Sequence, residues 1–195
     1  MRIHPLLPLA LAALLSACAA PARLPEVPVA AYSETIELNG RLSVNYSKDG
    51  APESLSGKFN WVQAGERIDV SLASPLGQTI AKITVTPREA TLVQSDQVTR
   101  SAPDIDTLTM DTLGWRLPVT GLRDWLQGYA TAQDGSRFVA SPANNEVVTK
   151  DGWRLRYVSW QDDATARVQP RRIDVSRPAS LQSEALEIRI VIDPA

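Results

Sequence analysis

The segment GRLSVNYSKDGAPESLSGKFNWVQAGERIDVSL, residues 40–72, decides the fold class of this chain. Apolar and polar residues alternate along it with a period of two, as in Leu42-Ser43-Val44 and Ile68-Asp69-Val70. This period is typical of β-strands that bury one face and expose the other. The links between the alternating runs, at 48–50 and 63–66, are short and turn-like. Links of this length favour antiparallel neighbours, so the segment predicts consecutive antiparallel strands.

The same alternation extends on both sides of this segment, beginning at Ile36. Further strands are predicted at 79–86, 91–99, 137–141, 146–150, 153–160, 172–176 and 185–192. Asp151-Gly152, between two of these runs, is a signal for a two-residue hairpin. The last run is the most regular, because every second residue from Leu186 to Ile192 is a leucine or an isoleucine.

Between the two groups of strands the period changes to that of a helix. Ser101 is a candidate helix cap, with Asp104 in the first turn and an apolar face that ends at Gly114. A second short helix is predicted over residues 120–127, with Gly128 as its stop. Two helices are therefore expected to interrupt the strands.

Together these patterns predict a mainly β fold of the α+β class. The most economical arrangement is a strongly curved antiparallel sheet of about ten or eleven strands, an incomplete barrel covered by the short helices. Such a sheet either fills its concave side with its own side chains or encloses an apolar cavity. The residues alone leave both outcomes open.

Inward-facing strand positions are the candidate lining of such a cavity: Val44, Phe59, Val70, Leu72, Ile83 and Ile188. A register shift of one residue would turn any of them to the other face. Large aromatic residues more often pack in a core than line a ligand cavity. Core packing is therefore the main expectation for each of Phe59, Trp61, Trp115, Trp125, Trp153, Tyr157 and Trp160.

The first 17 residues have the order of an export signal: a basic start at Arg2, an apolar run from Leu6 to Leu15, and small residues before Cys18. The apolar run is too short to span a bilayer, which takes about 20 residues. Leu15-Ser16-Ala17-Cys18 looks like a lipoprotein lipobox, in which the cysteine is acylated after cleavage. Ordinary secretion with an incidental cysteine is the alternative.

The chain is therefore divided into a lipoprotein signal peptide at 1–17, an acylated N-terminus with a proline-rich tether at 18–33, and one domain at 34–195. An aspartate directly after the acylated cysteine would be expected to retain a lipoprotein in the inner membrane. This chain has Ala19 there, so residence in the outer membrane is expected.

Composition argues against most catalytic and metal-binding classes. The only histidine is His4, in the signal, and the only cysteine is Cys18, which acylation consumes. The mature domain then has no imidazole base, no thiolate and no nitrogen or sulfur metal ligand. We therefore expect that the protein is not an enzyme and that it has no catalytic residue, cofactor or metal. Nucleophilic catalysis by a serine with a lysine as its base stays chemically possible. The net charge of −2 gives no basic excess for nucleic acid.

The segment 113–119, LGWRLPV, followed by 121–128, GLRDWLQG, strongly resembles the outer-membrane lipoprotein receptor family LolB. Further similarities occur in order along the chain, at Gly40-Arg41-Leu42-Ser43-Val44, Trp61, Ser74-Pro75-Leu76-Gly77 and Gly152-Trp153. The likeness covers about residues 36–192. One departure is the C-terminal end, Asp193-Pro194-Ala195, which lacks a tryptophan-containing end found in some members.

The resemblance implies a fold like that of the periplasmic carrier LolA, with an apolar cavity. It implies a receptor that accepts lipoproteins from a LolA-type carrier and inserts them into the inner leaflet of the outer membrane. The domain 34–195 would bind lipoprotein acyl chains as a monomer, lipid-anchored on the periplasmic face and in contact with outer-membrane lipid. Pro75, Leu76 and Gly77 would form the membrane-insertion loop, whereas the residues alone equally allow Leu76 to fold into the core.

Two other functions remain open from the residues. A lipocalin-like envelope lipoprotein would hold a free apolar ligand in the same cavity. A structural lipoprotein would have a solidly packed barrel and another assembly protein as its partner. The structural lipoprotein would have no cavity, whereas the lipoprotein receptor and the lipocalin-like protein would each have one.

Overall fold

The computed structural model describes residues 27–194 with gaps at 49, 95–96, 114–116, 162–167 and 180–184. The predicted signal, Cys18, Ala19 and the first part of the predicted tether lie outside the described residues. So do Gly114 and Trp115 of the central motif.

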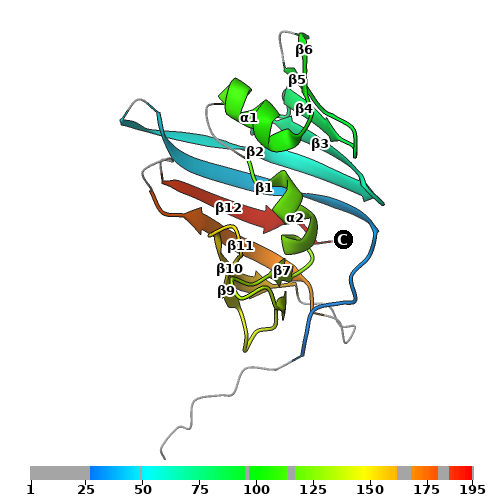
Figure 1. The fold of residues 1–195 in the computed structure, drawn as a ribbon, viewed down its shortest axis with the longest axis vertical. Coiled ribbons are helices and arrows are strands. Elements are labelled where there is room, and N and C mark those ends of the chain that lie inside the picture. The colour runs from blue at the N-terminus through cyan, green and yellow to red at the C-terminus, as the bar shows by residue number, and fades with distance from the viewer. Residues whose placement is uncertain are drawn as a thin grey trace, which may run out of the picture.

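Ten antiparallel strands form one open, strongly curved sheet (Figure 1). In spatial order they are β6 (Thr99–Ala102), β5 (Ala90–Gln94), β4 (Thr79–Val85), β3 (Arg67–Ala73), β2 (Ala51–Ala64), β1 (Thr35–Lys48), β12 (Leu186–Ile192), β11 (Pro170–Arg177), β10 (Arg154–Trp160) and β9 (Glu146–Val148). The edges β6 and β9 do not pair with each other, so the barrel is incomplete. The predicted fold class is confirmed.

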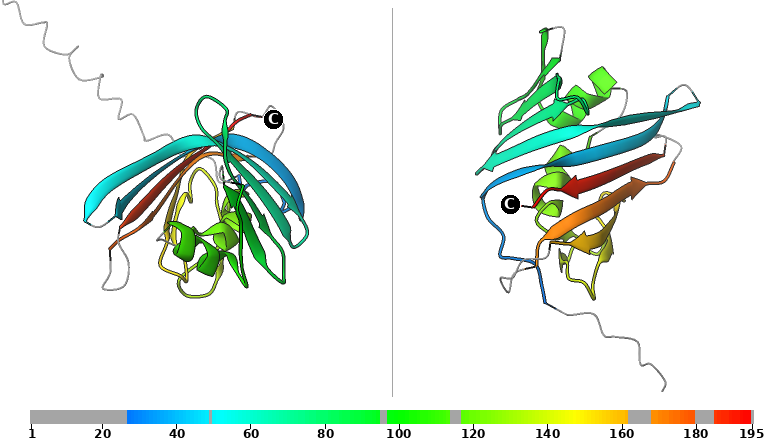
Figure 2. Two further views of the ribbon diagram at one scale, coloured as in Figure 1. Left: turned by 90° about the horizontal axis from the view of Figure 1, so that it is seen from above. Right: turned by 180° about the vertical axis from the view of Figure 1, so that it is seen from behind.

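Two helices lie on the concave face of the sheet, which arches over them (Figure 2). They are α1 (Ile105–Leu113) and α2 (Val119–Trp125). Asp104 caps α1, since its Oδ1 accepts a hydrogen bond of 2.8 Å from the Thr107 backbone N–H. The predicted cap at Ser101 is wrong because that residue pairs with Thr91 in the sheet.

The predicted strand over 91–99 is wrong in its extent. The chain folds back on itself after Gln94, and β5 pairs with β6 as an antiparallel hairpin. Gln97 has a φ of 58°, and its backbone N–H donates a 3.0 Å hydrogen bond to the Gln94 carbonyl oxygen. A residue in this left-handed region cannot continue a straight strand. The alternation of apolar and polar residues in the sequence therefore runs on through a turn, where the strand itself ends.

The predicted strand over 137–141 is shorter than expected and does not belong to the large sheet. Strands β7 (Tyr129–Thr131) and β8 (Arg137–Val139) form a separate two-stranded sheet. By contrast, the hairpin predicted at Asp151-Gly152 is present, because β9 and β10 pair on either side of that turn. Its loop is longer than the predicted two residues, since the Thr149 N–H donates a 2.8 Å hydrogen bond to the Trp153 carbonyl oxygen. The Gly152 N–H donates a 2.9 Å hydrogen bond to the Thr149 carbonyl oxygen.

The end of the predicted tether is packed against the domain. Val29 is buried, and its N–H donates a 3.1 Å hydrogen bond to the Ala140 carbonyl oxygen. The Tyr129 hydroxyl donates a 2.7 Å hydrogen bond to the Ala30 carbonyl oxygen, and its ring meets Tyr32 edge-on at 5.7 Å. Val29 is the first buried residue of the described chain, so a chain starting at residue 19 contains every buried residue that the structure describes.

One hydroxyl group ties the two helices together. Thr109 on α1 is buried; its Oγ1 donates a 2.9 Å hydrogen bond to the Ile105 carbonyl oxygen and accepts a 3.1 Å bond from the Leu117 backbone N–H. Leu117 lies just before α2. The second bond satisfies a backbone donor of the inter-helix link that would otherwise lose its partner.

We predict that Thr109→Val lowers the free energy of unfolding by about 1–3 kcal/mol, since it preserves volume but leaves the Leu117 N–H without its acceptor. Urea unfolding of residues 19–195 measures this change. The control is Thr112→Val on the same helix, whose hydroxyl bonds only the Leu108 carbonyl oxygen within the described chain. Equal losses for the two variants would contradict the prediction.

Candidate functional site

An apolar cavity of about 270 Å³ lies between the concave face of the sheet and the two helices. The structure places all six residues predicted as cavity lining on its wall: Val44 of β1, Phe59 of β2, Val70 and Leu72 of β3, Ile83 of β4 and Ile188 of β12. The concave side of the sheet is therefore not filled completely by its own side chains.

The six residues are three directly opposed cross-strand pairs. Val44 lies opposite Ile188, Phe59 opposite Leu72, and Val70 opposite Ile83. Directly opposed residues in antiparallel strands project to the same face, so each pair adds one apolar patch to the wall. The period of two thus determined which face each residue occupies, and the pairing determined its neighbour.

The helices supply the other wall. Ile105 and Leu108 come from α1, Leu122 comes from α2, and Leu126 follows directly after α2. The sequence predicted two helices, the first with an apolar face, but did not assign any helix residue to a cavity. The helical spacing of these residues was visible in the sequence. Which face of the sheet α1 and α2 would cover was not.

The lining offers little chemistry beyond apolar contact. No charged side chain of the described chain lines the cavity, and its polar side chains include Gln94 and Thr109. Trp61 is buried in the wall, and its indole Nε1 has no hydrogen-bond partner among the described residues. Ligand sites normally orient polar ligands with a few convergent polar groups. This cavity therefore suits an apolar chain held by the hydrophobic effect.

Most of the other large aromatic residues form a packed cluster away from the cavity. Trp125 and Trp153 lie with ring centroids 6.0 Å apart, and Tyr157 stacks between Phe138 at 6.2 Å and Trp160 at 5.8 Å. The Tyr157 hydroxyl donates a 3.1 Å hydrogen bond to the Trp125 carbonyl oxygen. Burial raises the pKa of Tyr157. These rings are core, whereas Phe59 and Trp61 face the cavity.

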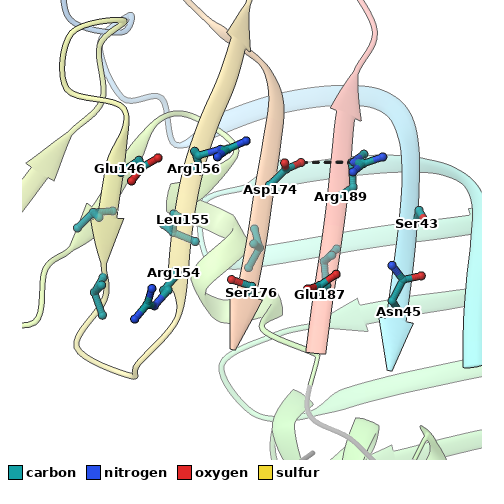
Figure 3. A pocket seen from close by; sticks show the side chains of 14 residues that line it. Ser43, Asn45, Glu146, Arg154, Leu155, Arg156, Asp174, Ser176, Glu187 and Arg189 are labelled. Atoms are coloured by element: carbon teal, nitrogen blue, oxygen red, sulfur yellow. Dashed lines mark ion pairs between the residues drawn. The ribbon is translucent and has the colours of Figure 1, made fainter. Parts of the chain in front are cut away.

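A larger hollow, of about 620 Å³, lies on the opposite face of the sheet (Figure 3). Its wall carries charged side chains, including Arg154, Arg156 and Glu187. Arg189 and Asp174 form an ion pair across it at 3.5 Å. An apolar chain placed there would desolvate these charges at a high cost. The smaller apolar cavity is therefore the candidate site.

The β3–β4 loop presents a leucine to solvent. Leu76 is 92% exposed, and Pro75 and Gly77 beside it are also exposed. Gly77 has a φ of 88°, and its N–H donates a 2.8 Å hydrogen bond to the Ser74 carbonyl oxygen. This tight turn, which rises from the convex side of the sheet in Figure 2, turns Leu76 away from the core.

The N-terminal segment holds the end of α2. The Arg123 guanidinium donates hydrogen bonds to the Tyr32 hydroxyl at 3.2 Å and to a Glu34 carboxylate oxygen at 2.8 Å. Gln127 exchanges two hydrogen bonds with the backbone of Ser33. The helix that covers the cavity is thus attached to the chain segment that leads towards the N-terminus.

Among the described residues, no three histidine, cysteine, aspartate or glutamate side chains gather where they could hold a metal ion. Among these same residues, neither helix has the length and apolar character needed to cross a membrane.

Comparison with solved structures finds distant likenesses. A DUF1329 family protein from Desulfovibrio piger is 12% identical with a TM-score of 0.48, covering 82% of this chain and 84% of its own. A LolA superfamily protein from Nitrosomonas europaea is 9% identical with a TM-score of 0.41, covering 82% and 87%.

Comparison with known sequences is more specific. The family described as "Outer membrane lipoprotein LolB" matches residues 34–194. A protein named "Outer-membrane lipoprotein LolB" from Cupriavidus necator is 45% identical over 184 residues, which are 93% of this chain and 90% of the relative. A protein of the same name from Cupriavidus taiwanensis is 43% identical over 188 residues, covering 93% and 91%. The chain belongs to the LolB family of outer-membrane lipoproteins.

Proposed function

We propose that this protein accepts lipoproteins from a LolA-type periplasmic carrier and inserts them into the inner leaflet of the outer membrane. Acyl groups on Cys18 would hold it on the periplasmic face of that membrane. The single observation that carries the proposal is the apolar cavity between the curved sheet and two short helices. The names of its relatives as outer-membrane lipoproteins support the location.

The physics of lipid transfer requires such a cavity. Exposing an acyl chain to water costs about 0.8 kcal/mol per CH₂ group, so an acylated client must be covered at each stage. The chain has no P-loop motif to drive transfer with a nucleotide. The acceptor must then bind the client more tightly than the carrier does, by about 1.4 kcal/mol for each tenfold preference.

The cavity must enlarge to hold a client. Its volume of about 270 Å³ lies just below the roughly 300–1,000 Å³ of typical small-molecule sites. Several long acyl chains exceed that space, whereas the sheet wall is held by continuous strand pairing. We infer that α1 and α2 move outward when a client binds, because they are short and contribute one whole wall.

A second function is supported by the same volume. A cavity of this size would hold one small apolar ligand without any movement, as a lipocalin-like binding protein does. Transfer of a lipoprotein separates the two functions, since a free-ligand binder has no reason to accept a client from a carrier.

We predict that residues 19–195, mixed with a complex of a LolA-type carrier and a lipoprotein, acquire the lipoprotein without added nucleotide. Affinity capture of the acceptor and immunodetection of the client measure the transfer. A folded acceptor that leaves the client on the carrier would contradict the proposed function and favour the free-ligand alternative.

We predict that Leu72→Asn weakens binding of a fluorescent fatty acid by roughly tenfold or more, because an unpartnered amide would be buried in the apolar wall. Titration of residues 19–195 with the fatty acid measures the dissociation constant. Ser71→Asn, on the opposite face of the same strand, is the matched control and should bind as the wild type does. Unchanged binding by folded Leu72→Asn would show that the ligand does not occupy this cavity.

We predict that Leu76→Glu leaves client uptake intact but lowers release into liposomes by about tenfold or more, since burying a leucine contributes about 1.5–3 kcal/mol. Flotation of the client with the liposomes measures release. Val148→Glu is the control, because Val148 is also exposed but lies on the edge strand β9, away from the loop. Normal release by Leu76→Glu would defeat the proposed membrane contact.

A further inference from the structure

A shallow hollow of about 560 Å³ lies on the convex face of the sheet, directly beside the Leu76 loop. Pro75 of that loop forms one side of it, and β1, β2 and β12 form its floor. Three of its lining residues are basic: Arg41, Lys58 and Arg189. The exposed leucine and this basic floor therefore belong to one continuous surface.

The three basic residues are crowded on adjacent strands. Arg41 of β1 lies directly opposite Lys58 of β2 in the register. Arg189 of β12 lies opposite Ser43, which is two residues from Arg41 and on the same face of β1. Like charges at directly opposed positions destabilise a sheet. Folding alone therefore gives no reason for placing Lys58 opposite Arg41, whereas binding of an anion would.

Nearby acidic groups only partly offset these charges. Arg41 reaches Asp193 at 3.5 Å, with the Arg41 side chain 65% exposed. Arg189 reaches Asp174 at 3.5 Å and is 60% exposed. Within the part of the chain that the structure describes, Lys58 makes no ion pair and no side-chain hydrogen bond, and its neighbour on β3 is Ala73. The floor is thus locally positive although the whole chain carries a net charge of −2.

We propose that Arg41, Lys58 and Arg189 bind the phosphate groups of membrane phospholipids while Leu76 enters the bilayer. The proposal rests on the membrane contact of Leu76 proposed above. The headgroup region is roughly 5–8 Å thick on each side of a bilayer. A leucine at the acyl boundary would therefore place Pro75 and the basic floor at the level of the phosphates. Guanidinium and ammonium groups form charge-assisted hydrogen bonds with phosphate oxygens.

Leu76 and the basic floor would contribute to membrane binding in different ways. Leu76 supplies apolar burial at one point, which leaves the domain free to rotate about the loop. Cations on three neighbouring strands add contacts beside that point and restrict the rotation. The basic floor would then orient the domain on the membrane during release of the client.

Vesicle binding by residues 19–195 tests the proposal, because the chain without Cys18 has no acyl anchor to mask the surface contact. The vesicles are pure phosphatidylcholine or phosphatidylcholine containing phosphatidylglycerol, and co-sedimentation measures the partition coefficient. A basic side chain near an anionic surface adds about fivefold to binding. Lys58→Gln should therefore lose about fivefold on anionic vesicles, Lys58→Arg should retain binding, and the difference should shrink in high salt.

Lys150→Gln is the matched control, because Lys150 is an exposed lysine in the turn before β10, away from the Leu76 loop. It should bind anionic vesicles as the wild type does. Equal binding by Lys58→Gln and the wild type would overturn the proposal. Equal losses for Lys58→Gln and Lys150→Gln would also overturn it, because they would show only an effect of net charge.

Two further measurements separate this proposal from the proposed function. Lys58→Gln should take up a client from the carrier normally, since Lys58 lies on the face opposite the cavity. Leu76→Glu should weaken binding to both kinds of vesicle. If Leu76→Glu is impaired and Lys58→Gln is not, the basic floor has no role while the loop contact stands. If Leu76→Glu binds normally, the membrane contact and the headgroup proposal both fail.

Discussion

The pairing of β1 with β12 is the interaction on which the rest of the structure depends. Residues 40–46 run antiparallel to residues 186–192, so segments near the two ends of the domain lie side by side in the middle of the sheet. This pairing joins the strands before the helices to those after them. Without it each group would expose its apolar face to water, and no common concave wall would form for α1 and α2 to cover.

The alternation of apolar and polar residues along the strands gives the sheet an apolar concave face and a polar convex face. On the concave face, opposed pairs such as Val44 and Ile188 form an apolar wall, and the helices complete the cavity. On the convex face, the residues between them are mostly polar or charged, as at Ser43 and Arg189. A register shift between Leu72 and Ala73 precedes the β3–β4 loop, and such irregularities redirect a strand. The loop leaves the sheet there and brings Leu76 beside the basic floor.

The cover of the cavity is held by few interactions compared with the sheet. The Thr109 hydroxyl links α1 to the segment before α2, and Arg123 and Gln127 attach α2 to residues 32–34. Burial raises the pKa of the Asp124 carboxyl next to Arg123, with the Tyr32 hydrogen bond acting in the opposite direction. The outward movement of the helices proposed above would be transmitted to the N-terminal segment through these hydrogen bonds.

The sequence by itself determined the fold class, the face of each regular strand, the apolar side of both helices and the family. These features are local, since a period of two or of 3.6 residues is complete within one element. The sequence misplaced the cap of α1 at Ser101. It also predicted that a strand continues through the turn at Gln97, because the apolar and polar alternation continues there although the backbone turns. Only the tertiary structure decided that a cavity remains, that Leu76 points outward, and that Arg41 meets Lys58 beside it. Those outcomes depend on register, helix placement and loop direction, which arise from contacts between residues far apart in the chain.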